Sequence, residues 1–357
     1  MRACRNLSVY NLDVIAGFAT PPGATRFARR FQTARDRGFY RAFDGIEIST
    51  LGLGTYLGDP DDPTDIAYRD ATIAAVHGGI NCLDTAINYR QQRSECSIGA
   101  ALEHLFNSGG VERDEVVIAT KAGFLTPGAV PKSLKPEDVA SGMHSMQPDF
   151  LADQIDRSRS NLRLETIDIF YLHNPETQLG VLSRDLFDER IRLAFGRLEQ
   201  LVAEGKIRYY GTATWDGYRR PAGARDALDL TLLLEIAKEI SGSAHHFRFI
   251  QLPLNLAMPE AFTNGVLELA AKSGIAAVAS ATLSQARLAR NLPASLAEKF
   301  PGLSFDAQRA IQFTRSTPGI ITALVGMSNP VHVLENLAVA RVPPLPEHEY
   351  RDLYQRA

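Results

Sequence analysis

The chain has 357 residues, of which 45% are hydrophobic and 22% charged, an ordinary globular composition with enough apolar surface for a large core. The formal net charge of −3 gives no electrostatic reason to expect nucleic acid or an anionic membrane as a partner. No apolar run approaches the roughly 18 residues of a membrane span, and the three cysteines form no C-x-x-C pair. We therefore expect no membrane segment and no metal site, and a cytoplasmic location.

Residues 1–40 differ from the rest of the chain, because they hold seven Arg, two Asp and no Lys. Arg-rich, acid-poor composition is one mark of an organelle transit peptide, but the serine richness of such peptides is missing. The stretch GATRFARRFQTA also has apolar residues at helical spacing. We favour a short helical N-terminal extension and keep the transit peptide as the alternative.

From about residue 42, short β-rich runs alternate with longer helical patterns. The predicted strands cover residues 50–56, 80–86, 115–121, 167–174, 207–215, 247–255, 275–283 and 322–328. Helical patterns cover residues 65–79, 94–106, 154–162, 185–205, 226–241, 259–274, 306–316 and 330–340. Several strands are near-continuous apolar runs, as parallel strands covered on both faces are.

Eight β–α units favour a closed (β/α)8 TIM barrel over an open sheet. No composition shift marks a second domain, so we predict one barrel domain over residues 41–345, an N-terminal extension over 1–40 and a C-terminal tail over 346–357. The longest irregular stretch, residues 122–149, is rich in Pro and Gly and follows the third strand. A loop of that length is usually functional, and in a barrel it would lie over the site.

Polar residues at strand ends are the candidates for chemistry, because barrel enzymes place their catalytic groups there. Asp84, Lys121 and His173 end three successive strands, and Tyr89 follows Asp84 by five residues. Each alone has an ordinary interpretation: a helix cap, a solvated lysine, a structural histidine or a packed tyrosine. Their coincidence on adjacent strands favours a shared site.

The four side chains together suit the reduction of a carbonyl, which needs a proton donor as hydride arrives. A tyrosine hydroxyl has a pKa of about 10, and a nearby ammonium lowers it by stabilising the phenolate. Asp84 would keep Lys121 charged and oriented, while His173 would donate a hydrogen bond to the carbonyl oxygen. On this interpretation Tyr89 is the general acid and base.

The chain resembles the aldo-keto reductase family over about residues 42–341. The matching motifs, in chain order, are LGLGTY (51–56), LDTAINY (83–89), IATKAGF (118–124), DIFYLHNPE (168–176), FIQLPLN (249–255) and ALVGMSNPVHVLENL (323–337). The resemblance implies an oxidoreductase with Tyr89 as general acid/base, tuned by Lys121 and Asp84, with His173 orienting the carbonyl. It also implies a nicotinamide cofactor, with NADP(H) favoured over NAD(H).

The resemblance also implies a set of cofactor-binding residues. Physically, the glycines before Tyr56 would let the nicotinamide end approach the backbone, and the helix start after VGMSNP is a ready anion site. An N-cap role for Asn329 stays open as the alternative. The implied cofactor residues are Gly54, Thr55, Tyr56, Thr214, Gln251, Leu283, Gln285, Gly326, Ser328, Asn329, Glu335 and Asn336.

Four features depart from the family pattern. One is the predicted seventh strand, SATLSQARL, which lacks the usual proline and late glycine, although Leu283 and Gln285 are assigned to the pyrophosphate. Ala213 and Thr214 stand where the family often has Ser-Asn, and Asn329 and His332 stand where many relatives carry Arg or Lys against the 2′-phosphate. The segment RQQR after Tyr89 is slightly long. It would place Arg90 or Arg93 at the pocket mouth or form a solvated charged loop, and we favour the loop.

Two other functions are weighed against the reductase. A cofactor-binding regulatory or partner subunit with little turnover is the first, motivated by the N-terminal extension and the altered amide contacts. A barrel lyase or isomerase using Lys121 as a Schiff base is the second, and Asp84 disfavours it because it holds the lysine protonated. The substrate is expected to be a small carbonyl or alcohol, with no nucleic acid or membrane partner, and the oligomeric state is left open.

Overall fold

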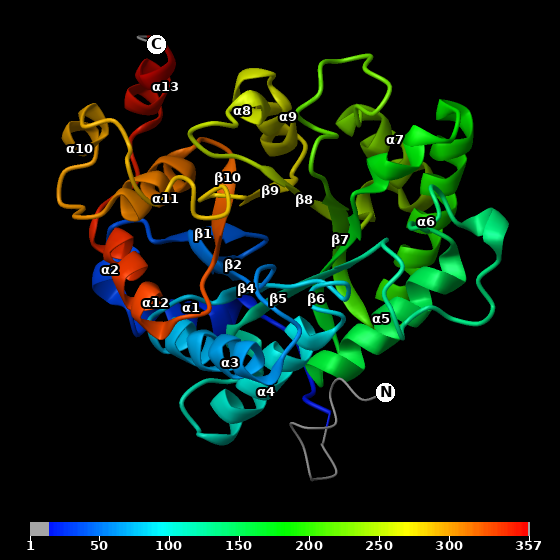
Figure 1. The fold of residues 1–357 in the computed structure, drawn as a ribbon, viewed down its shortest axis with the longest axis horizontal. Helices are drawn as coiled ribbons and strands as arrows, with labels where there is room; N and C mark the ends of the chain where they lie inside the picture. Colours follow the sequence, from blue (N-terminus) through cyan, green and yellow to red (C-terminus); the bar gives the residue numbers. More distant parts are fainter. Residues whose placement is uncertain (1–13, 356–357) are drawn as a thin grey trace.

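A closed barrel of eight parallel strands forms the centre of the computed structural model, which describes residues 14–355 (Figure 1). The strands close in the order β10-β3-β4-β5-β6-β7-β8-β9, so the predicted (β/α)8 architecture is confirmed. Their bounds are β3 (Leu51–Gly54), β4 (Cys82–Asp84), β5 (Val117–Ala122), β6 (Ile167–His173), β7 (Ile207–Ala213), β8 (Phe247–Pro253), β9 (Ala276–Ser280) and β10 (Ile320–Gly326).

Helices cover the outside of the barrel. They are α3 (Asp62–His77), α4 (Arg93–Asn107), α5 (Pro148–Leu162), α6 (Arg184–Ala203), α7 (Leu230–Ser241), α8 (Glu260–Thr263), α9 (Val266–Lys272), α10 (Ser295–Lys299), α11 (Asp306–Ser316) and α12 (Pro330–Asn336). Side-chain caps set several starts: Asp61 accepts a hydrogen bond from the Thr64 amide at 2.9 Å. The single helix predicted over 259–274 is two, because Gly265 adopts a left-handed φ of +85° between them.

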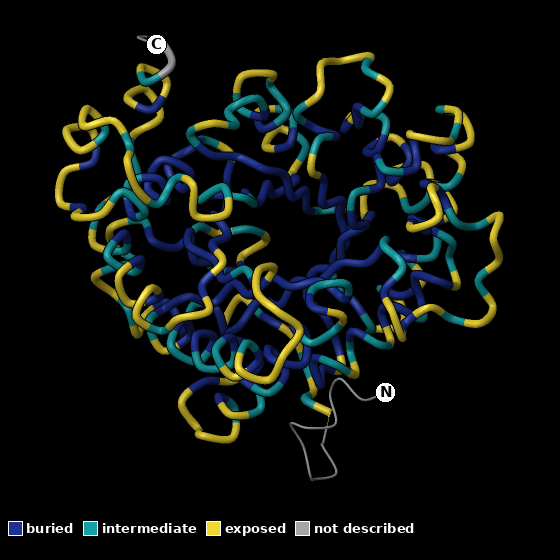
Figure 2. Tube along the Cα trace, in the orientation of Figure 1, coloured by how far each residue is buried: buried dark blue, intermediate teal, exposed yellow. Residues whose placement is uncertain are grey.

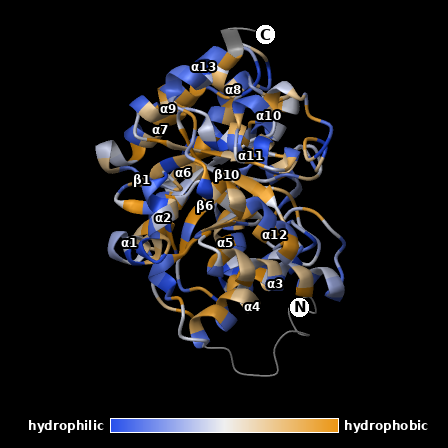
Figure 3. Cartoon of the chain, turned by 90° about the vertical axis from the view of Figure 1, so that its left-hand side faces the viewer, coloured by the Kyte–Doolittle hydropathy of each residue, from blue (hydrophilic) through white to orange (hydrophobic). Residues whose placement is uncertain are grey.

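Two apolar layers follow from this arrangement. One fills the space between barrel and helices, and the other lies inside the barrel. Figure 2 shows the buried chain at the centre and the exposed chain around it. Every residue of β6 is buried, and β10 appears in Figure 3 as a hydrophobic band. The near-continuous apolar strands of the sequence are therefore strands covered on both faces.

A hairpin closes the amino end of the barrel. Strands β1 (Tyr40–Phe43) and β2 (Ile46–Ser49) pair antiparallel, joined by Asp44 and Gly45 at φ values of 49° and 76°. Two successive positive φ values are typical of the Asp-Gly turns that match strand twist. The Phe43 ring lies 4.8 Å from the Phe249 ring, centroid to centroid, so the hairpin packs against the inner layer of the barrel.

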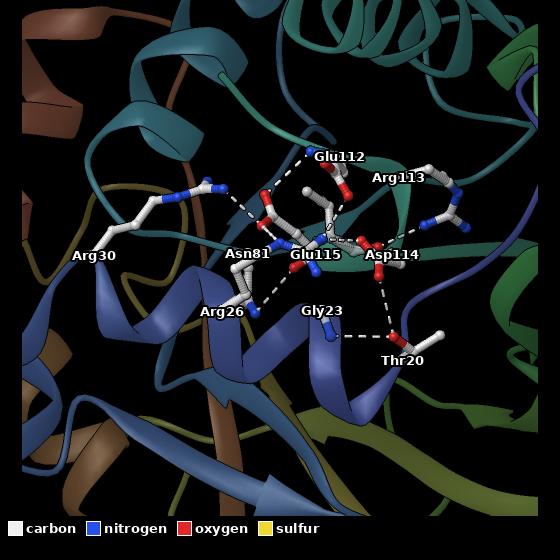
Figure 4. Close-up of polar contacts among 10 residues, drawn as sticks. Thr20, Gly23, Arg26, Arg30, Asn81, Glu112, Arg113, Asp114 and Glu115 are labelled. Carbon is white, nitrogen blue, oxygen red and sulfur yellow. Dashed lines mark hydrogen bonds and ion pairs between the residues drawn. The ribbon is translucent and has the colours of Figure 1, made fainter. Parts of the chain in front are cut away.

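The described part of the predicted extension is helical and packed onto the barrel. The stretch over 23–34 forms parts of α1 (Pro21–Arg29) and α2 (Gln32–Asp36). Arg26 pairs with Asp114 and Glu115 at 2.5 and 2.7 Å, and Arg30 pairs with Glu115 at 2.7 Å (Figure 4). Because the Glu115 side chain is fully buried, these arginines attach α1 to the turn before β5. Residues 1–13 lie outside the described part of the chain.

The predicted C-terminal tail contains a further helix, α13 (Glu347–Gln355). Its Tyr350 is buried, and the Tyr350 hydroxyl lies 2.7 Å from the Thr317 hydroxyl. Over residues 14–355, none of the helices combines the length and the apolar character that crossing a membrane requires.

Candidate active site

The carboxyl ends of three neighbouring strands bring the predicted catalytic residues to one cavity. Asp84 ends β4, Lys121 is the next-to-last residue of β5, and His173 ends β6. The strands pair in register, with Asp84 opposite Ala119 and Lys121 opposite Tyr171. Asp84, Tyr89 and His173 line a cavity of about 510 Å³, a volume typical of small-molecule sites.

A buried ion pair forms the floor of this site. The Lys121 ammonium lies 2.5 Å from Asp84 Oδ1 and donates to the Thr85 carbonyl at 2.8 Å. Gln251 donates from its side-chain amide to the other Asp84 oxygen at 2.8 Å. Burial raises the pKa of Asp84 and lowers that of Lys121, and each partner's charge opposes the shift of the other. The Lys121–Asp84 contact and the two further hydrogen bonds, to the Thr85 carbonyl and from the Gln251 amide, fix both groups in place.

Tyr89 lies among aromatic rings above that pair. Its ring centroid is 5.1 Å from Lys121 Nζ, 5.0 Å from the Tyr56 ring and 5.7 Å from the His173 ring. Among the described residues the Tyr89 hydroxyl makes no hydrogen bond to Lys121, whose donors go to Asp84 and Thr85. Lysine therefore faces the ring of the tyrosine.

The predicted net lowering of the Tyr89 pKa is not found in this arrangement. Burial raises the pKa of Tyr89 well above its ordinary value, and the Asp84 carboxylate adds to the shift. Tyr89 is consequently a protonated phenol at neutral pH.

A left-handed turn holds Tyr89 in position. Arg90, Gln91 and Gln92 have φ values of 47°, 55° and 74°, an unusual run for residues other than glycine. The Arg90 guanidinium anchors the turn, because it is buried and lies 2.5 Å from Asp65 Oδ1. The favoured interpretation of this segment as a solvated charged loop is thus wrong for Arg90, which supports the turn from inside.

His173 presents a neutral imidazole to the cavity. Burial lowers its pKa well below the ordinary value, and the positive charge of Lys121 acts in the same direction. Its Nδ1 is buried and has no hydrogen-bond partner among the described residues. The Phe124 ring packs edge-on against it at 5.3 Å, centroid to centroid. A neutral imidazole fixed by packing is suited to hydrogen-bonding a substrate oxygen.

The long loop over 122–149 is attached to the catalytic strand through one histidine. His144 is fully buried, and its Nε2 lies 2.7 Å from the carbonyl oxygen of His173. Since a carbonyl only accepts, this nitrogen carries the proton, and Nδ1 accepts from the Gln178 amide at 3.1 Å. Arg190 in turn donates to the Gln178 oxygen at 3.0 Å. His144 therefore ties the loop to the strand that ends in His173.

We expect His144 to make the protein less stable in acid. Burial lowers its pKa to about 4, whereas an unfolded chain has a histidine pKa of about 6.5. Between these values only the unfolded state binds the proton, so the free energy of unfolding falls with falling pH, by about 3 kcal/mol in full. Urea unfolding from pH 7 to 4 of the wild type and of His144→Gln measures this. A variant with an unchanged pH slope would contradict the assignment.

The structure brings eight of the twelve predicted cofactor residues to the cavity wall. They are Gly54, Thr55, Tyr56, Thr214, Gln251, Leu283, Gln285 and Gly326. Ser328, Asn329 and Glu335 are exposed and lie outside this cavity. Asn329 accepts from the Val331 amide at 2.9 Å, so the N-cap interpretation is confirmed. Asn336 is buried, with its amide 3.4 Å from the sulfur of Met327.

Several cavity residues were not singled out from the sequence. Asn88, Thr282, Phe124 and Trp215 line the wall, and only their positions just beyond strand ends could have indicated them. Buried oxygens without partners in the described chain occur on Asn88, Thr214 and Thr282. Unpaired polar atoms around a cavity fit an amide- and phosphate-bearing cofactor that would satisfy them.

The loop after β9 adds backbone strain to the same wall. Ala281, Ser284, Gln285 and Ala286 have φ values between 45° and 66°, which side chains other than glycine rarely adopt. Ala281, Gln285 and Ala286 line the cavity. Strain of this kind persists where the surroundings impose it and clusters at ligand-binding sites.

A parallel barrel with a tyrosine, a lysine–aspartate pair and a histidine at its carboxyl rim is the architecture of a barrel oxidoreductase. The sequence profile of the Aldo/keto reductase family matches residues 50–355, and the chain belongs to this family. A Schizosaccharomyces pombe relative named "putative voltage-gated potassium channel subunit beta" is 24% identical over 82% of this chain and 85% of its own length.

Solved structures of the family share the fold. The holo form of aldo-keto reductase AKR11C1 from Bacillus halodurans has a TM-score of 0.64 at 21% identity, covering 89% of this chain and 96% of its own. An aldo/keto reductase from Klebsiella pneumoniae in complex with NADP and acetate has a TM-score of 0.62 at 20% identity, covering 88% and 93%.

Proposed function

We propose that this protein reduces the carbonyl group of a small aldehyde or ketone with a reduced nicotinamide cofactor. The observation that carries the proposal is the gathering of Asp84, Tyr89 and His173 on one cavity above the buried Lys121. The reverse oxidation of an alcohol uses the same groups. Family membership and the unpaired cavity oxygens support the proposal.

Each of the four side chains has a distinct part in this reaction. Tyr89 donates the proton to the carbonyl oxygen, and its raised pKa keeps that proton on the phenol until it is needed. Lys121 stabilises the phenolate that forms, while Asp84 fixes the ammonium at 2.5 Å. His173, held neutral by burial, hydrogen-bonds the substrate oxygen.

The cofactor supplies the hydride when bound. Gly54, Thr55 and Tyr56 would border its nicotinamide end, Thr214 and Gln251 its carboxamide, and Leu283 and Gln285 its pyrophosphate, since all of them line the cavity. Gly326, Ser328, Asn329, Glu335 and Asn336 would serve the adenosine end. We propose NADP(H) over NAD(H), supported by the Klebsiella pneumoniae structure with NADP.

A second candidate function is a cofactor-binding regulatory or partner subunit with little turnover. The relative named as a potassium channel subunit favours it. The complete set of Tyr89, Lys121, Asp84 and His173 disfavours it, since a pure sensor has less need of a proton donor. Both candidate functions require the protein to bind the cofactor, but only the reductase would use it to convert a substrate.

We expect NADPH to quench the fluorescence of Trp215, which is the only tryptophan and lines the cavity. The reduced nicotinamide absorbs where tryptophan emits, so the emission should fall and saturate with a 1:1 stoichiometry. NADH should need a higher concentration than NADPH. Trp215→Phe is the control, because it must lose the signal. A titration without any change in emission would contradict cofactor binding in this cavity.

The same samples then separate the two functions. NADPH oxidation is followed with a panel of aliphatic and aromatic aldehydes and ketones. A reductase consumes NADPH with at least one class of carbonyl, whereas a regulatory subunit binds NADPH and leaves it unchanged across the panel.

A further inference from the structure

Two aromatic side chains of the active-site cavity flank the strand that ends in His173. Phe124 follows β5 and Trp215 follows β7, and β5 and β7 are the strands that pair with β6 on its two sides. Both rings line the cavity. His173 stands opposite Ala213 in the register of β6 and β7, so Trp215 comes two residues after the partner of the histidine. The two rings therefore border the place where the His173 imidazole meets the cavity.

A short helical segment after His173, η4 (Pro175–Gly180), contacts the loops that carry both rings. On one side, Gln178 of η4 donates to His144 Nδ1 at 3.1 Å, and the His144 ring lies 5.2 Å from the Phe124 ring, centroid to centroid. On the other side, Glu176 of η4 contacts the turn that begins at Trp215. The segment that follows the catalytic histidine thus links the two aromatic walls of the cavity.

The Glu176 carboxylate accepts hydrogen bonds from three successive backbone amides. Its Oε1 lies 2.8, 3.2 and 3.3 Å from the amide nitrogens of Trp215, Asp216 and Gly217. Successive amides that converge on one point form a concave site for a negative charge. Glu176 is only 7% exposed, and its Oε2 has no hydrogen-bond partner in the described chain. The side-chain contacts of this carboxylate are therefore made to the turn alone.

The position of the Trp215 ring depends on the backbone of this turn. Backbone pairing with the neighbouring strand ends one residue earlier, where the Thr214 amide donates to the Gln251 carbonyl at 2.9 Å. The Trp215 side chain is 44% exposed, and within residues 14–353 it makes no hydrogen bond and no ring contact of its own. Removing the Glu176 carboxylate would leave three amides without their acceptor. The ring would then lose the contact that holds its backbone at the cavity.

We propose that Glu176 is a positioning residue for the substrate, which holds Trp215 at the cavity so that its ring binds the body of a neutral aromatic carbonyl compound. This inference rests on the proposed reductase function. Trp215 and Phe124 offer apolar surface on the two sides of His173. Among the described residues no lysine or arginine lines this cavity, and Asp84 is its only charged lining residue, so a second charge on the substrate would find no cation there.

Glu176→Ala tests the proposal in the steady-state reduction of benzaldehyde and of propanal. The KM for benzaldehyde should rise about tenfold, because a wall of the binding site is displaced. The kcat should stay within about twofold, because the lost contact is made to the body of the substrate and the four reacting groups are unchanged. Propanal presents less surface to the ring, so its KM should change less. Time-resolved anisotropy of the emission of Trp215, the only tryptophan, should show added nanosecond motion of the ring.

Two further variants separate positioning from a general loss of stability. Glu176→Gln keeps an acceptor oxygen and should restore most of the KM and of the anisotropy. The matched control is Glu199→Ala, because Glu199 also accepts several hydrogen bonds, among them the Tyr210 hydroxyl at 2.9 Å and the His246 amide at 2.7 Å, and does not line the cavity. It should lower stability and leave the KM and the anisotropy as in the wild type. If circular dichroism shows that Glu176→Ala is unfolded, Glu176→Asp, which withdraws the carboxylate by one methylene, takes its place.

Trp215→Ala should also raise the KM for benzaldehyde, and adding Glu176→Ala should raise it no further, because the carboxylate acts through the ring. Additive effects of the two substitutions would overturn the proposal, and so would a Glu176→Ala protein with the KM and the anisotropy of the wild type. A wild type that reduces charged keto acids and leaves benzaldehyde unreduced would overturn the neutral aromatic class. A wild type that reduces no carbonyl overturns the reductase function instead, and the anisotropy then still shows whether Glu176 holds Trp215.

Discussion

Tyr89→Phe should lower kcat by about 10²–10⁴-fold, the usual contribution of a positioned general acid, with little change in NADPH affinity. The substitution removes one hydroxyl and keeps the ring, which packs at 5.0 Å from Tyr56 and 5.7 Å from His173. The cavity wall is therefore preserved, and only the proton donor is lost. Steady-state kinetics on the best carbonyl substrate gives kcat, and the Trp215 quench gives the NADPH affinity.

Tyr171→Phe is the matched control for this loss. Tyr171 is the other tyrosine near the ammonium, with its ring centroid 6.0 Å from Lys121 Nζ. It is fully buried and does not line the cavity, so its hydroxyl cannot reach a substrate. We expect it to retain activity within an order of magnitude of the wild type. Tyr89→Phe retaining comparable activity, or both variants failing alike, would contradict the role of Tyr89.

The positions of Asp84, Lys121 and His173 at strand ends could be predicted from the sequence, because they depend only on the local apolar pattern and on one geometric rule. Apolar runs locate the strands, and parallel strands of a barrel present their carboxyl ends at one rim. Asp84, Lys121 and His173 follow from these two facts alone. The tyrosine was found through its spacing from Asp84, and the contact of its ring with His173 then depended on the turn that follows it.

What the sequence did not reveal depends on contacts between distant segments. The buried position of Arg90 requires Asp65, 25 residues away, and a left-handed turn that composition does not predict. The pKa of Tyr89 rises because of burial, a property of the folded cavity. His144 lies in a stretch that reads as an irregular loop, and its contact to His173 spans 29 residues.

Lys121→Met should abolish turnover and also destabilise the fold, by about 3–5 kcal/mol, as removal of one partner from a buried ion pair does. Lys121 is fully buried and Asp84 is 4% exposed, so the variant leaves a carboxylate without its cation. Urea unfolding measures the loss. It should shrink as the pH falls, because burial raises the pKa of Asp84 and protonation removes the unpaired charge.

The double variant Asp84→Asn with Lys121→Met separates stability from catalysis. Asparagine keeps the shape of the aspartate and can still accept from Gln251, which donates to that side chain at 2.8 Å. Without a buried charge the double variant should recover most of the lost stability and remain inactive, since no ammonium is left to stabilise the phenolate. Recovery of activity along with stability would show that Lys121 serves only the fold. A single variant as stable as the wild type would instead show that Asp84 is not ionised in the folded protein.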